Sequence, residues 1–244
     1  MATTFQARVE KYFTNACGAA YMPSTTQLTD ILTSGAATVI NRVPKGLLGG
    51  MTLEATVSDG SGYSIASSKI DNVQRYYKTN TTYYPCRSVT SSNRRYLTDY
   101  NSMQYAPYND PAFYVLANKI YIKPDPTADH KGYVYYIVYP TVAYTDTEAT
   151  AAVATWPMGM IDLVVTYSVG QIKLREIDYY KDIISDAKAV IEALVTADDT
   201  EVAQTEIVAL QGYTTALNSS VADFAAIEEK FEKNLQGFIQ GLST

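Results

Sequence analysis

The chain has 244 residues, 47% of them hydrophobic, and a formal net charge of −6. Its length and its mean hydropathy of −0.12 are those of a globular protein with a sizeable core, and they exclude a disordered chain. The acidic balance argues against a protein that wraps nucleic acid, which needs a dense Lys and Arg surface. No apolar run reaches the length of a membrane-spanning helix, so no membrane partner is expected.

The first predicted elements are two helices. One covers residues 3–20, and the other begins after Pro23, with a cap among residues 24–26, and ends at Pro44. Helical spacing places one set of apolar residues on a single face of the second helix: Leu28, Ile31, Leu32, Val39, Ile40 and Val43. The glycine-rich segment 46–50 is predicted to be a flexible joint, since it lacks the Gly-Lys-Ser/Thr of a phosphate-binding loop.

From Met51 to Pro140 the sequence changes to short segments rich in β-branched and aromatic residues, separated by turn clusters. Ile120 and Ile122 alternate with polar residues, which indicates a strand with one buried face. Residues 133–139 are apolar on both faces, which favours a central or doubly covered strand. Of the 22 tyrosines, 16 lie between Tyr63 and Tyr144. Tyrosine suits both half-buried sheet faces and subunit interfaces, so this enrichment fits a plain strand preference and an interface equally.

Two long helices are predicted after a spacer of small residues. Pro157 opens the first, and its apolar residues recur every three or four positions from Leu163 to Leu194. Gly170 lies in this series and suggests a close helix crossing. The second runs from about Glu201 to Leu242, with Asp198 and Asp199 as caps. Its apolar series is Leu210, Tyr213, Leu217, Val221, Phe224, Ile227, Phe231, Leu235, Phe238 and Leu242.

These elements predict an α+β fold in which N- and C-terminal helices form a bundle around an inserted antiparallel β-sheet or small β-sandwich. The expected division is residues 1–48 for the N-terminal helices, 49–150 for the β-rich insertion and 151–244 for the long C-terminal helices.

Residue types that carry catalysis or bind metals are sparse. His130 is the only histidine, and its turn sequence predicts a solvated hairpin loop rather than a metal site or a catalytic dyad. Cys17 and Cys86 are far apart and are expected to be reduced, partly buried thiols. No catalytic, cofactor-binding or metal-binding residue is therefore predicted, and the chain is not expected to be an enzyme.

Interfaces are the remaining kind of site. Arg94 and Arg95 form the densest basic spot, which predicts a contact to an acidic partner or to DNA phosphate, or else an edge-strand charge pair that blocks sheet aggregation. Tyr135 is a candidate on the sheet. The phenylalanines of the last helix are candidates for docking, although such a series is more often core: Phe224, Phe231 and Phe238.

Four features, taken in order, resemble the head-to-tail adaptor (neck, or connector) proteins of tailed bacteriophages. They are a helix ending at a proline (Thr26–Pro44), an I-x-x-V-x-R strand (Ile70–Arg75), a tyrosine-containing strand before a P-x-P turn (Phe113–Pro126), and a Pro157-led helix with the acidic Asp178 near its middle. The match covers roughly residues 24–197. It departs from the family pattern at residues 198–244, which add a further helix.

The resemblance implies a virion structural protein in the head-tail neck, assembled in the host bacterial cytoplasm. Its implied partners are other copies of itself in a closed ring, commonly a dodecamer, together with the portal protein and tail or further neck proteins. DNA would pass through the acidic lumen without sequence-specific binding. Two alternatives remain open: a carbohydrate- or receptor-binding β module of a phage tail, and a tail-tube or baseplate component.

Overall fold

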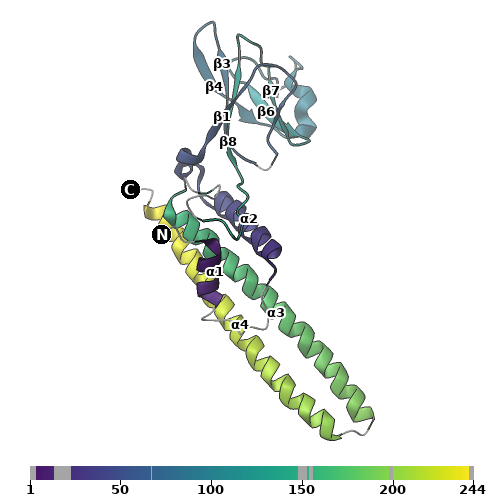
Figure 1. Cartoon of the computed structure of the whole chain (residues 1–244). Helices are drawn as coiled ribbons and strands as arrows, with labels where there is room; N and C mark the ends of the chain where they lie inside the picture. Colours follow the sequence, from purple (N-terminus) through teal and green to yellow (C-terminus); the bar gives the residue numbers. More distant parts are fainter. Residues whose placement is uncertain are drawn as a thin grey trace. The chain divides into compact units, whose positions relative to one another are not determined.

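The computed structural model describes residues 4–13, 23–66, 68–147, 153, 156–197 and 200–241. The fold is α+β, as predicted (Figure 1). The chain divides into two compact units: a helical unit of residues 1–42 and 140–244, and a β unit of residues 43–139. Among the described residues, no helix is long and apolar enough to cross a membrane.

The helical unit contains α1 (Phe5–Phe13), α2 (Thr25–Arg42), α3 (Met158–Thr196) and α4 (Thr200–Gly241). In Figure 1, α3 and α4 lie side by side as a long hairpin, and α1 and α2 pack against α3. Residues 14–20 of the first predicted helix, the proposed caps Asp198 and Asp199, and Leu242 lie outside the described residues.

The start of α2 is fixed by a reciprocal cap. The backbone N–H of Gln27 donates to Ser24 Oγ (3.3 Å), and the Ser24 N–H donates to Gln27 Oε1 (2.9 Å). This pairing satisfies two amide groups that the first helical turn would otherwise leave without acceptors. The apolar face predicted for this helix is buried, from Leu28 to Val43.

The close helix crossing lies at Gly35, not at Gly170. A Cβ at Gly35 would stand 2.8 Å from Ser168 Oγ and 3.4 Å from the Val164 carbonyl oxygen, so α2 crosses α3 here with no room for a side chain. Gly170 faces α4, but a Cβ there would meet Ile227 at an ordinary 3.4 Å. Gly159 makes the closer contact with α4, because a Cβ added there would stand 2.7 Å from the Phe238 ring.

The first half of α3 is buried on several sides, as predicted from Val165, Val169 and Ile172. The distal half of the α3–α4 hairpin is thinner. Two helices alone cannot enclose a full apolar core, and four valines are exposed there by 45% to 60%: Val190, Val195, Val202 and Val208.

The apolar series predicted for α4 is only partly inward. Phe231 and Leu235 are buried, whereas Tyr213 and Val221 are exposed. The expectation was wrong at these two positions because only α3 covers α4 over much of its length. The apolar stripe of α4 is wider than the surface that α3 covers, so part of the stripe stays exposed. Ser220 and Ala203 take buried positions on the contact side instead.

The β unit is a small sandwich of two four-stranded sheets. The first has the order β1 (Leu53–Val57), β8 (Gly132–Val138), β3 (Ser68–Tyr77), β4 (Thr82–Pro85). The second has the order β2 (Tyr63–Ser64), β7 (Lys119–Lys123), β6 (Ala112–Leu116), β5 (Arg87–Ser88). All pairings are antiparallel except β5–β6, which is parallel, so the second sheet is mixed. The β8 strand is central, as its two apolar faces predicted.

Side chains from both sheets meet in one core, whose buried members are Val57, Ile65, Val73, Ile120, Ile122 and Val134. The outer side of the second sheet is covered by a 3-10 helix, η3 (Ser91–Leu97), and the loop after it. Leu97 and Ala106 there pack against Ala112 and Tyr114 of β6. The outer side of the first sheet has no such cover among the described residues.

The glycine-rich segment is not an open joint. It forms two 3-10 turns, η1 (Lys45–Leu47) and η2 (Gly49–Met51), and Leu48 between them is fully buried. Lys45 Nζ donates to the Asp71 carbonyl, which attaches this segment to the β unit. In the segment that follows β8, the N–H groups of Val142 and Tyr144 donate to threonine side chains of α2, so this segment belongs to the helical unit. The β unit therefore begins earlier and ends earlier than the predicted 49–150.

Candidate functional site

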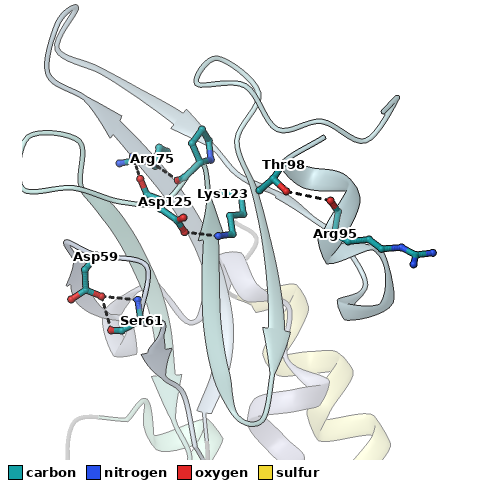
Figure 2. Close-up of polar contacts among 8 residues, drawn as sticks. Asp59, Ser61, Arg75, Arg95, Thr98, Lys123 and Asp125 are labelled. Carbon is teal, nitrogen blue, oxygen red and sulfur yellow. Dashed lines mark hydrogen bonds and ion pairs between the residues drawn. The ribbon is translucent and has the colours of Figure 1, made fainter. Parts of the chain in front are cut away.

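A buried arginine joins two of the sequence features on which the resemblance rests. Arg75, the last residue of the I-x-x-V-x-R strand, is completely buried. Its Nη2 donates to the Asp125 carbonyl (2.8 Å) and its Nε to the Pro124 carbonyl (3.3 Å), so it holds the P-x-P turn (Figure 2). Burial lowers the pKa of Arg75, and nearby Tyr108, Cys86 and Asp125 oppose that effect. The role of this side chain is to bind its own backbone.

Arg94 and Arg95 lie on η3, not on a strand, so the edge-strand interpretation is wrong. The Ser-Ser-Asn sequence before them starts a 3-10 turn, and the adjacent second sheet ends at β5. Both arginines are exposed, and the Arg95 side chain extends away from the sheets in Figure 2. Arg95 also lies over the Tyr96 ring, with its guanidinium carbon 4.7 Å from the ring centroid.

These arginines belong to a projecting segment that we call the η3 knob, residues 91–103. Tyr100 is 81% exposed and Met103 is fully exposed at its tip. Arg87 of β5 fixes the base: its Nη2 donates to the carbonyls of Gln104 (2.7 Å) and Tyr105 (3.0 Å). Leu97 is buried beneath. The knob is thus an ordered structure that presents apolar side chains beside two positive charges.

Tyr135 lies on the uncovered outer side of the first sheet. The register places it beside Glu54 and Asn72, and the same side carries Tyr76, Tyr83 and Tyr133. We call this surface the tyrosine face. Three of its rings form a row, with centroids 5.0 Å apart for Tyr76–Tyr83 and 5.6 Å for Tyr83–Tyr133. Tyr135 is half-buried, and burial, followed by its hydrogen bond with Glu54, raises its pKa.

The three phenylalanines of α4 face α3 rather than solvent. Phe231 is buried, with its ring centroid 5.7 Å from that of Tyr167 and the Arg42 guanidinium over its face. Phe238 contacts Gly159. Phe224 is half-buried above Gly170. Phe231 therefore belongs to the core of the helical unit, which is the plain interpretation of this series.

Phe224 lines an open groove of about 350 Å³ between the two long helices, which we call the α3–α4 groove. Its floor is apolar, and includes Tyr167, Gly170, Ile227 and Phe231. Its rim is charged and mostly acidic: Glu228, Glu229, Glu232 and Arg42. Arg42 forms an ion pair with Glu232, which leaves Glu228 and Glu229 as the rim's excess negative charge.

A buried ion pair within α3 also contacts α4. Lys173 and Glu176 are both nearly inaccessible to solvent, with Lys173 Nζ 2.8 Å from Glu176 Oε2 and 3.3 Å from Asp223 Oδ2 on α4. Charges removed from water this fully require close partners, so the contact fixes how the two helices align. Asp223 is partly exposed at the side of this pair.

His130 and Cys86 have structural surroundings. His130 is half-buried rather than solvated: it stacks on Tyr77 at 4.4 Å, and its Nδ1 accepts the Lys78 N–H at 3.1 Å. Burial raises the pKa of the Cys86 thiol to about 12, although the nearby Arg75 charge opposes this, so the nucleophilic thiolate is scarce. Cys17 lies outside the described residues.

Within the described parts of the chain, no group of three or more His, Cys, Asp or Glu side chains could hold a metal ion. The surfaces that stand out are the η3 knob, the tyrosine face, the α3–α4 groove and the exposed valines. Searches of protein-family models and of curated proteins found no match to this chain.

The sequence pointed to Arg94, Arg95 and Tyr135 as interface residues, which stays a prediction, but it gave no sign of the contacts made by Arg75, Arg87 and the Lys173–Glu176 pair. Arg75 was visible only as part of a pattern, with no indication of what it binds. Lys173 carried a usable signal, because it falls among buried apolar positions of α3 where a charge needs a partner.

Proposed function

We propose that this protein is a structural subunit of the head-tail neck of a tailed bacteriophage, an adaptor that closes into a ring between portal and tail. It acts through contacts between surfaces and uses no catalysis, metal or cofactor. The ring is assembled in the host cytoplasm and becomes part of the virion. The resemblance supplies the neck assignment, and its four features correspond in order to α2, β3, the β6–β7 pair with its turn, and α3.

The observation that carries assembly is the exposed apolar surface of the distal hairpin. Four valines there have solvent-exposed side chains on helices that are about 40 residues long. Exposed apolar side chains of this number on a two-helix hairpin favour burial against another chain. Asp178, the acidic residue of the resemblance, is exposed on α3 and forms an ion pair with Lys181.

The charge of the chain fits a DNA conduit. Twelve copies at −6 each carry 12 × −6 = −72 before partners are counted. A wall of this sign repels phosphate, so duplex DNA slides through without sticking.

The test is the mass and shape of the full chain, alone and mixed with portal rings of the same phage, by native mass spectrometry and negative-stain electron microscopy. We expect symmetric rings seated on the portal. The Val195→Asp/Val208→Asp variant should assemble poorly with unchanged circular dichroism, whereas Gln211→Asp, an exposed position on the same helix, should assemble normally. A chain that stays monomeric and ignores the portal at high concentration would overturn the proposal.

A second candidate function is supported by the tyrosine face. A row of half-exposed rings beside Asn and Gln side chains is suited to stacking on sugars and hydrogen bonding to their hydroxyls. In that case the monomer would bind host surface glycans, and Tyr83→Ala would abolish binding. Glycan binding by a monomer that does not assemble would favour this candidate over the neck.

A further inference from the structure

The η3 knob carries exposed apolar side chains on a backbone that hydrogen bonds hold in place. Its tip residues Tyr100 and Met103 are the two most exposed large apolar side chains of the described chain. Arg87 holds its base through three hydrogen bonds, to two carbonyls and to Asp110. Because the segment is ordered before contact, little conformational entropy is lost when it docks.

The α3–α4 groove matches the tip in size and polarity. Its 350 Å³ is on the order of a dozen water volumes, enough for one or two side chains but not for a helix. Phe224 and Tyr167 line it with aromatic rings, and a methionine packs well against such rings.

The charges beside these two surfaces are complementary. Arg94 and Arg95 are exposed in the same segment as Tyr100 and Met103, and Glu228 and Glu229 are exposed residues that line the groove. The chain as a whole carries −6, so two copies repel each other except where opposite charges meet. Such local pairs set the orientation in which chains associate.

We infer that the η3 knob of one copy docks in the α3–α4 groove of the next, an inference that rests on the proposed ring. The two surfaces are different, so the contact is head-to-tail, and each copy keeps one free knob and one free groove until the ring closes. The occupant of the groove is therefore a second copy of this chain, and Arg94 and Arg95 contact its acidic rim.

The experiment uses full-length variants under the condition in which the wild type assembles, alone or on portal rings. A knob variant, Tyr100→Ser/Met103→Ser, changes side chains that are exposed in the monomer. A groove variant, Ala225→Trp, fills the groove from an exposed position on its lining. Leu53→Ala, which removes an exposed apolar side chain elsewhere, is the matched control.

We expect the knob variant and the groove variant each to lose ring assembly on their own, with association weakened tenfold or more, about the cost of one hot-spot contact, whereas Leu53→Ala should assemble as the wild type does. Mixed together, the two variants should form a one-to-one dimer and stop, because one intact knob and one intact groove remain. Arg94→Glu/Arg95→Glu should also block assembly, and an equal amount of Glu228→Arg/Glu229→Arg should restore rings in which the two variants alternate, because every contact between unlike copies is again complementary.

Normal rings from both the knob and groove variants would overturn this inference and leave the neck proposal standing. Failure of the wild type to assemble at all would overturn both this inference and the neck proposal. If the arginine variant assembles normally but loses affinity for duplex DNA, the basic spot is a DNA contact and the charge pairing is wrong.

Discussion

Arg75 shows how one side chain can define a turn. It is buried among the core residues of the sandwich, yet its hydrogen bonds go to two backbone carbonyls of the P-x-P turn. A guanidinium offers donors from three nitrogens in a fixed plane, so it can bind two carbonyls from two separate nitrogens, which the single nitrogen of Lys cannot do.

Arg75→Met should therefore destabilise the β unit by about 2–4 kcal/mol, since both carbonyls lose a charged donor. Urea unfolding followed by near-UV circular dichroism measures this, because most of the tyrosines lie in this unit. Arg94→Met is the control and should change stability by less than about 0.5 kcal/mol, because Arg94 is exposed. Equal effects of the two changes would contradict the role given to Arg75.

Cys86 makes the stability of the β unit depend on alkaline pH. Its folded pKa of about 12 lies above the ordinary value of 9.0, so the fold favours the neutral thiol. This contribution is fully present below about pH 9 and is lost as the pH rises toward 12. The urea midpoint should fall more between pH 8 and pH 10.5 in the wild type than in Cys86→Ala. Parallel pH profiles would show that burial does not hold the thiol neutral.

At the scale of elements, two glycines in helices should respond oppositely to the same change. Gly35→Leu drives a side chain into Ser168 and the α3 backbone, and should cost about 1–3 kcal/mol. Gly212→Leu, with nothing within 4 Å of its Cβ, should gain roughly 0.5–1 kcal/mol from helix propensity. Thermal unfolding followed at 222 nm measures both, and a stabilised Gly35→Leu would rule out the close crossing.

The buried Lys173–Glu176 pair of α3, which also contacts Asp223 of α4, gives another test. Lys173→Met removes the ammonium partner of a buried carboxylate and should cost about 3–5 kcal/mol, whereas Lys173→Met/Glu176→Leu should recover most of that loss. Fluorescence of Trp156, the only tryptophan and a buried residue of the helical unit, reports the unfolding. If the double variant is as unstable as the single, packing rather than charge explains the cost.

Periodicity predicted the helices and the central strand β8, because one-dimensional spacing determines which residues share a face. It could not predict which glycine lies at the close contact between two helices, since that depends on where α2 meets α3. The η3 segment has no period, so Arg94 and Arg95 were expected at a strand edge. The α3–α4 groove needs residues of two helices and Arg42 together, and no single stretch of sequence contains it.

At the scale of the whole molecule, the β unit is continuous in the chain and has its own core. We expect residues 43–139, expressed alone, to fold, because their principal core contacts lie within that segment. A well-dispersed two-dimensional NMR spectrum of the fragment would show this. A collapsed spectrum would mean that the sandwich depends on the helices.

The helical unit, in contrast, is assembled from segments on either side of the β unit in the sequence. During synthesis on the ribosome, α1 and α2 emerge first but cannot be covered until α3 and α4 follow, well over a hundred residues later. At translation rates of about 5–20 residues per second, their apolar faces stay uncovered for several seconds or longer. The sandwich can form in that interval, so a chaperone that shields the early helices would act while the β unit is already folded.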